Sequence, residues 1–73
     1  MVDEGDFAEL VRPCLVRLYG MARRLVGDQA EDVVQETLIS AYRSFDQLQS
    51  PESIASWLAA ILVNHCRDRW RAD

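Results

Sequence analysis

The chain has 73 residues, of which 49% are hydrophobic, twelve are acidic and eight are basic, giving a net charge of −4. A chain this short forms one domain at most and buries only about 60% of the surface that its unfolded form exposes. The high hydrophobic content, together with only three glycines and two prolines, argues for a compact helical domain and against a disordered chain. No apolar run approaches the ~20 residues of a membrane span, and the acidic start is not typical of a secretory signal. We therefore expect a cytoplasmic protein that does not insert into membranes.

The first predicted helix covers residues 6–26. Asp6 can cap its start, and apolar residues follow at helical spacing. Pro13 lacks a backbone donor and disfavours the helical conformation of the residue before it. We therefore expect the first helix to be bent or split near Arg12.

The second predicted helix covers residues 29–45. Gly27 can adopt the left-handed conformation that ends a helix, and Asp28 with Glu31 is typical of a new helix start. Read at roughly 100° per residue, its apolar stripe consists of Ala30, Val33, Val34, Thr37, Ala41 and Phe45.

The opposite face of this helix carries an isoleucine among polar side chains. Ile39 lies there together with Asp32, Gln35, Glu36 and Arg43. An apolar centre with a polar rim is typical of a protein-binding surface. A single exposed isoleucine is also common, and acidic residues near a helix N-terminus simply complement the macrodipole. The pattern alone leaves both interpretations open.

The third predicted helix covers residues 52–71 and follows a polar segment at 46–53. Ser50 before Pro51 is typical of a helix start. Its apolar stripe consists of Ile54, Trp57, Leu58, Ile61, Leu62 and His65. Three helices with short connections predict an all-α fold, a compact three-helix bundle in one domain over residues 1–73. We expect its core to close around Leu18, Val34, Trp57, Leu58 and Ile61.

The other face of the third helix combines small residues with hydrogen-bond donors. It carries Ser56, Ala60, Asn64, Arg67 and Arg71. Asparagine and arginine can donate to phosphates or base edges, which favours a nucleic-acid surface. A solvated face whose arginines complement the helix C-terminus explains the same residues.

The residues that could perform chemistry do not form a catalytic or metal-binding pattern. Cys14 and Cys66 are far apart and belong to no CxxC or Cys/His motif, so we expect two buried, reduced thiols. His65 is the only histidine and is expected at the edge of the core. The sequence therefore predicts neither an enzyme nor a cofactor or metal site.

Three segments together resemble the second conserved region of bacterial sigma factors, of the extracytoplasmic-function (ECF) type. They are DVVQET at 32–37, AYRSFD at 41–46 and SWLAAILVN at 56–64, and the resemblance extends from about Phe7 to Arg71. It implies a domain that docks on RNA polymerase and recognises the promoter minus-ten element as a melted single strand. Asp32, Gln35 and Glu36 occupy the positions that contact the clamp helices of the beta-prime subunit. Ile39 would be the apolar centre of that contact.

The same resemblance implies where promoter DNA is bound. The loop at 46–53 and the start of the third helix occupy the segment that captures a flipped base, and later residues of that helix contact the DNA. The implied DNA-binding residues are Gln47, Gln49, Ser53, Ser56, Asn64, Arg67 and Arg71. Such factors continue into a second, helix-turn-helix domain and are usually held by an anti-sigma factor. We therefore expect the chain to be part of a two-domain protein with an anti-sigma partner.

Two alternatives to this function differ in their partners. The loop has no basic residue and carries Glu52, whereas nucleic-acid grooves normally depend on cations. DNA affinity should therefore be weak, and a sigma-like decoy that binds an anti-sigma factor without touching DNA fits the same motifs. A stand-alone helix-turn-helix repressor fits poorly, because its turn has three to four residues and this loop is longer.

Overall fold

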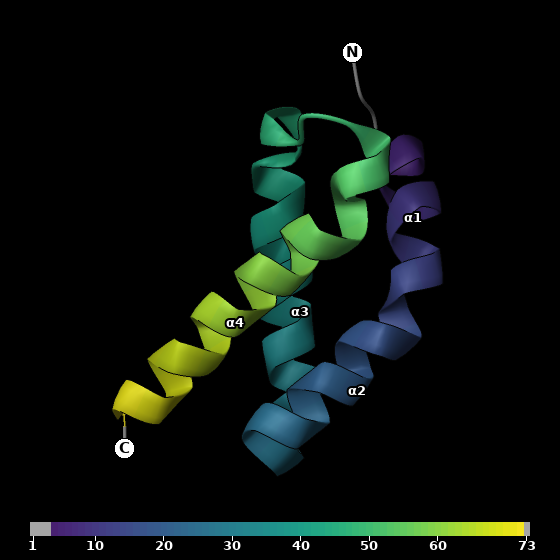
Figure 1. Ribbon diagram of the computed structural model, residues 1–73. Helices are drawn as coiled ribbons and strands as arrows, with labels where there is room; N and C mark the ends of the chain where they lie inside the picture. The colour runs from purple at the N-terminus through teal and green to yellow at the C-terminus, as the bar shows by residue number, and fades with distance from the viewer. Residues whose placement is uncertain (1–3, 73) are drawn as a thin grey trace.

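Four α-helices joined by 3-10 turns make up residues 4–72, the part of the chain that the computed structural model describes (Figure 1). The helices are α1 (Glu4–Val11), α2 (Leu15–Val26), α3 (Ala30–Arg43) and α4 (Ile54–Ala72). The 3-10 turns are η1 (Arg12–Cys14), η2 (Gly27–Gln29), η3 (Phe45–Gln47) and η4 (Pro51–Ser53). No strand occurs among these residues, so the all-α class is confirmed, and the count of three helices is approximate.

The predicted first helix is split where Pro13 requires it. The α-helical pattern gives way to the 3-10 turn η1, which has the proline at its start, and resumes at Leu15. Val11 and Leu15 on either side both keep helical backbone angles, so the chain bends without unwinding. Asp6 lies inside α1, and the predicted cap at that residue is therefore wrong.

The turn between α2 and α3 depends on a glycine. Gly27 has φ of 58°, a conformation that L side chains rarely adopt, and its N–H donates to the carbonyl of Arg23. The predicted cap at Asp28 is wrong. The N-cap of α3 is Gln29, which makes no side-chain capping hydrogen bond, because the 3-10 turn η2 leads directly into the helix.

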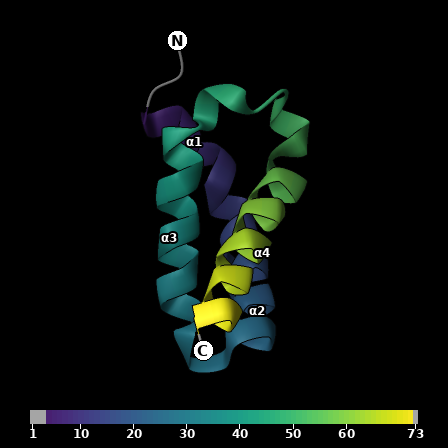
Figure 2. The ribbon, with the colours of Figure 1, turned by 90° about the vertical axis from the view of Figure 1, so that its left-hand side faces the viewer.

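Helix α4 crosses α3 obliquely, as the two views of Figures 1 and 2 show, and α2 also packs against α3. Helix α1 runs opposite to α3, and the ring of Phe7 packs edge-on against Tyr42 and Phe45 at 5.3 and 5.1 Å. The described residues have extents of 40 × 20 × 17 Å. Every residue of the predicted α3 stripe is buried, which confirms this part of the sequence analysis.

The buried stripe of α4 is rotated from its predicted position. It consists of Ile54, Leu58, Leu62 and Cys66. Trp57 and Ile61 were expected in this stripe but are only partly buried at its edge. His65 is also partly buried, which agrees with its expected place at the edge of the core. Of the predicted core residues, Leu18, Val34 and Leu58 are therefore confirmed, whereas Trp57 and Ile61 are peripheral.

The two cysteines are free thiols with different surroundings. Burial raises the pKa of the Cys66 thiol, and the nearby Arg69 guanidinium offsets part of that increase. The thiol of Cys14 is half-buried and lies 3.9 Å from the carbonyl oxygen of Leu10. The expectation of reduced thiols is confirmed for both, whereas the expected burial is confirmed for Cys66 and wrong for Cys14.

The last turns of α4 are tied to the end of α2. The indole N–H of Trp70 donates to the carbonyl oxygen of Leu25 at 3.0 Å. Carbonyls in the last turn of a helix have no partner within the helix. Trp70 of α4 therefore supplies a donor that satisfies the C-terminal end of α2. The Trp70 side chain nevertheless remains 49% exposed.

We predict that Leu58→Ala lowers the free energy of unfolding by about 2–5 kcal/mol, as expected for a large-to-small change at a fully buried site. Trp57→Ala should cost less, because Trp57 is only partly buried at the edge of the core. Urea unfolding followed by circular dichroism measures both. A larger loss for Trp57→Ala than for Leu58→Ala would show that the core is centred elsewhere.

Candidate functional site

Three of the four residues predicted to bind polymerase form an exposed face of α3. Asp32, Gln35 and Ile39 are all exposed, and the Ile39 side chain is 53% accessible. Their spacing of three and four residues places them on one side of the helix. Burial of Val33 and Val34 on the other side holds this face toward solvent.

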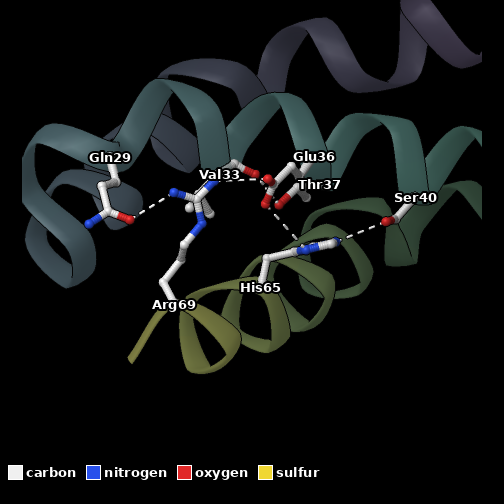
Figure 3. A network of polar contacts seen from close by, with 7 residues as sticks. All are labelled: Gln29, Val33, Glu36, Thr37, Ser40, His65 and Arg69. Carbon is white, nitrogen blue, oxygen red and sulfur yellow. Dashed lines mark hydrogen bonds and ion pairs between the residues drawn. The ribbon is translucent and has the colours of Figure 1, made fainter. Parts of the chain in front are cut away.

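The fourth residue, Glu36, is not a free outward-facing carboxylate. Its Oε2 accepts a hydrogen bond from Arg69 Nη2 at 2.8 Å, and its Oε1 lies 3.7 Å from His65 Nδ1. The side chain is turned toward α4 (Figure 3), although 45% of it remains accessible. The expectation that Glu36 faces only solvent is therefore wrong.

Glu36 is part of a polar network between α3 and α4 (Figure 3). Arg69 also donates from Nη1 to Gln29 Oε1 at 2.7 Å, so its guanidinium bridges two residues that are seven positions apart, about two turns along the same side of the helix. His65 Nε2 is hydrogen-bonded to Ser40 Oγ at 2.8 Å. The buried Thr37 lies beside this network and donates to the carbonyl of Val33 at 2.8 Å. The network closes the edge of the α3–α4 contact.

The sequence analysis missed this network because its members are remote in sequence. Arg69 lies 33 residues from Glu36 and 40 from Gln29. A signal was nevertheless present, because His65 and Arg69 are four residues apart and share one side of α4. Only the crossing of the two helices shows which residues they meet.

We predict that Arg69 and Glu36 stabilise the fold jointly. A double-mutant cycle of Arg69→Met and Glu36→Gln should give a coupling free energy of roughly 0.5–1 kcal/mol, because solvent screens a pair this accessible. Urea unfolding at low and high salt measures it, and the coupling should fall with salt. Arg67 is exposed on the same helix. The control is a second cycle in which Arg67→Met replaces Arg69→Met. A coupling of Glu36 to Arg67 as large as that to Arg69 would contradict the network.

Four of the predicted DNA-binding residues surround one hollow at the start of α4. The hollow has a volume of about 260 Å³ and is lined by Gln47, Gln49, Ser53 and Ser56, with Leu48 and Trp57. Two hydrogen bonds fix its rim: Ser53 N–H donates to the carbonyl of Ser50 at 3.0 Å, and Ser56 Oγ donates to the carbonyl of Ser53 at 3.2 Å. Amide and hydroxyl groups thus lie around an aromatic ring, a composition suited to a nucleobase.

The other three predicted DNA-binding residues lie outside this hollow. Asn64, Arg67 and Arg71 are exposed on α4, and their face is the one expected from the sequence. At ~1.5 Å per residue they begin about 12 Å beyond Ser56 along the helix. A single base cannot contact both groups, whereas a strand lying along α4 can.

A second hollow, which shares Ser56 with the first, is lined by an arginine that the sequence analysis did not consider. Arg17 lines a neighbouring hollow of about 310 Å³, together with Cys14, Met21 and Ser56. Ser56 therefore lines both hollows. Because Arg17 belongs to α2, only the packing of α2 against α4 brings it to the first turns of α4.

Two other kinds of site were sought in residues 4–72. No helix in this range is long and apolar enough to cross a bilayer. The same residues contain no group of three or more histidine, cysteine, aspartate or glutamate side chains that could hold a metal ion.

Comparison with known proteins identifies the class of this domain. The profile of the sigma-70 region 2 family matches residues 10–73. Because the match covers most of the chain, the chain belongs to this family, and it is a region 2 domain of the ECF sigma-factor type. The resemblance found in the sequence is thereby confirmed.

Several curated relatives carry the name ECF RNA polymerase sigma factor. SigG of Mycobacterium tuberculosis is 34% identical over 64 residues, which are 85% of this chain and 17% of SigG. SigM of the same species is 32% identical over 71 residues, or 94% of this chain and 36% of SigM. SigE of Mycolicibacterium smegmatis is 45% identical over 58 residues, or 77% of this chain and 22% of SigE. The chain thus spans about a third or less of these relatives, and no solved structure matches it.

Proposed function

We propose that this domain serves as the region 2 module of an RNA polymerase sigma factor in transcription initiation. In this proposal the outer face of α3 docks on the clamp helices of the beta-prime subunit. The loop before α4 and the exposed face of α4 hold the promoter minus-ten element as a single strand. The observation that carries the proposal is the joint exposure of Asp32, Gln35 and Ile39 on a helix whose other side is fully buried.

The docking part rests on the composition of the α3 face. Ile39 supplies apolar area that loses contact with water when a partner covers it. At the rim of this apolar area, Asp32 supplies a negative charge and Gln35 supplies an amide. These groups favour a partner helix that carries basic residues, and they fix the register in which that helix binds. Glu36 contributes through its accessible part and remains bonded to Arg69.

The DNA part rests on the hollow and on the two groups of residues along α4. An unstacked base entering the hollow would meet the Trp57 ring and the amides of Gln47 and Gln49. The strand would then pass Arg67 and Arg71, which can pair with phosphates. The lining of the hollow has no cation, so affinity should be weak and should depend on these more distant arginines.

We predict that Asp32→Arg abolishes binding to a beta-prime clamp-helix fragment while the domain stays folded, because Asp32 is exposed on α3. The charge-reversed Asp32→Arg/Glu36→Arg pair is a poorer test, since Arg at 36 would face Arg69. A pull-down with the fragment measures binding, and circular dichroism verifies folding.

The matched control is Asp68→Arg, which makes the same charge change at an exposed site on α4. It should bind the fragment like the parent. Undiminished binding by Asp32→Arg, or equal loss in Asp68→Arg, would remove the specific role of the α3 face.

We predict that the Arg67→Ala/Arg71→Ala variant binds single-stranded DNA more weakly than the parent at low salt. Each lost phosphate contact should reduce the slope of log affinity against log salt by about 0.7. Anisotropy of a labelled strand carrying a minus-ten-like sequence measures this. Gln49→Ala should instead alter which base is preferred, because Gln49 lines the hollow.

The control for this experiment is Arg23→Ala/Arg24→Ala, which removes two exposed arginines from the last turn of α2. Its affinity and salt slope should equal those of the parent. Equal affinity of the Arg67/Arg71 variant and the parent would contradict the DNA surface on α4.

One observation favours a second function, a sigma-like decoy that binds an anti-sigma factor and no DNA. The hollow is lined without a cation, and Glu52 lies in the turn η4 beside it. Failure of the parent to bind the labelled strand, even in the presence of core polymerase, would support the decoy over the promoter-binding module.

A further inference from the structure

The outer face of helix α2 is basic, although the chain as a whole is acidic. Helix α2 contains Arg17, Arg23 and Arg24 and no acidic residue. The rest of the chain holds the other five basic residues and all twelve acidic ones. The three arginines of α2 form no ion pair with any residue in the range 4–72. Their charge is therefore not neutralised within the part of the domain that the structure describes.

Apolar surface lies between these arginines. At ~100° per residue, the exposed residues of α2 follow one another around the helix in the order Tyr19, Arg23, Val16, Gly20, Arg24 and Arg17. Val16 is 85% exposed and Tyr19 is 37% exposed. The buried Leu18 and Ala22 hold the opposite side of α2 against the bundle, so this arc faces away from it. An apolar centre flanked by charge is typical of a protein-binding surface.

Gly20 lies at the centre of this face, and no packing contact among the described residues requires a glycine there. It lies inside α2, and the described glycine with a positive φ is Gly27. A Cβ added at Gly20 would meet no atom within 4 Å. Glycine inside a helix nevertheless makes that helix less stable than alanine does. The property that glycine does supply is a notch in the surface, which allows another backbone to approach closely.

A protein helix suits this face better than a phosphate backbone does. Phosphates bind to cations and hydrogen-bond donors, and they gain nothing from the exposed Val16. An apolar side chain of a protein partner, in contrast, removes the surface of Val16 from water. Acidic side chains beside it can pair with the arginines on both sides. The face therefore indicates a partner that is both apolar and acidic.

We propose that the exposed face of α2 binds an acidic amphipathic helix of a protein partner. The partner helix crosses α2 at Gly20, because the distance between two packed helices depends on the side chains at the point of contact. Its apolar residues cover Val16 and Tyr19, and its flanking carboxylates pair with Arg23 and Arg24. This face is separate from the α3 face and the α4 surface of the proposed function. Binding at α2 therefore does not depend on that function.

The test uses the full chain and a labelled synthetic peptide. The peptide is a helix with leucine and alanine on one face and glutamate on both flanks, and fluorescence anisotropy measures its affinity. A second peptide with glutamine in place of glutamate measures the contribution of charge. A labelled DNA duplex, titrated in the same buffer, tests whether the face binds phosphates instead.

The first variant, Gly20→Gln, fills the notch without adding apolar surface. Glutamine is a better helix former than glycine, so the urea midpoint of unfolding should rise. The affinity for the acidic peptide should fall about tenfold, because the two helices can no longer approach closely. A purely structural role of Gly20 would not move stability and affinity in opposite directions. Gly20→Ala should change both in the same directions, with a smaller loss of affinity.

The second variant, Arg23→Gln/Arg24→Gln, should bind the acidic peptide about fivefold more weakly, because two ion pairs are lost. Its affinity for the glutamine peptide should equal that of the parent. The matched control is Arg67→Gln/Arg71→Gln, which removes two exposed arginines from α4 and should bind the acidic peptide like the parent.

Parent-like binding by both Gly20→Gln and Arg23→Gln/Arg24→Gln would overturn the site on α2. An equal loss of affinity in the α4 control would also overturn it, since the peptide would then respond to net charge alone. Failure of the parent to bind the acidic peptide has the same meaning. Duplex binding that weakens in the α2 variants, without peptide binding, would replace the protein site by a nucleic-acid site. None of these outcomes alters the α3 face or the α4 surface.

Discussion

The burial of one stripe of α3 is the constraint from which both candidate surfaces follow. Val33, Val34, Thr37 and Ala41 are completely inaccessible, packed between the α1–α2 segment and α4. An α-helix advances about 100° per residue, so fixing this stripe also fixes the direction of every other side chain on α3. The direction of the exposed face with Ile39 is therefore set by the buried residues on the other side of the helix. Any substitution that repacks the stripe must therefore also reorient the proposed docking face.

The edge of the α3–α4 contact is polar, and this edge supports the orientation of α4. The buried stripe of α4 orients the helix, and the guanidinium of Arg69 supports that orientation because it meets Gln29 and Glu36 with a planar fork of fixed geometry. The bond between His65 and Ser40 adds a second fixed point one turn away. Together with the buried stripe, they determine that Arg67 and Arg71 face solvent. The residues of the proposed DNA surface are thus held by residues that do not belong to it.

Helical periodicity predicted α3 fully and α4 only partly, and the difference lies in residue types. Apart from Thr37 and Phe45, the α3 stripe contains small or β-branched apolar residues, which favour burial and have no polar tip. On α4, Trp57 and His65 each combine an apolar body with a polar tip, so periodicity placed them in the core although both lie at its edge. Position along the chain could not reveal that Glu36 turns toward Arg69, because that pairing depends on the helix crossing. The hollow at the loop could not be predicted from the sequence for the same reason. Its wall includes Trp57, and this requires Trp57 to lie at the edge of the core.

The two tryptophans of α4 have different surroundings, and this gives the domain a pair of built-in optical probes. Trp57 lies in the wall of the loop hollow, with its ring 6.5 Å from that of Phe45. Trp70 is half-exposed at the other end of the helix, with its indole N–H bonded to the carbonyl of Leu25. Their emission spectra and indole N–H resonances should therefore be distinct. Events at the hollow and the docking of the last turns of α4 can be followed separately in one unlabelled molecule.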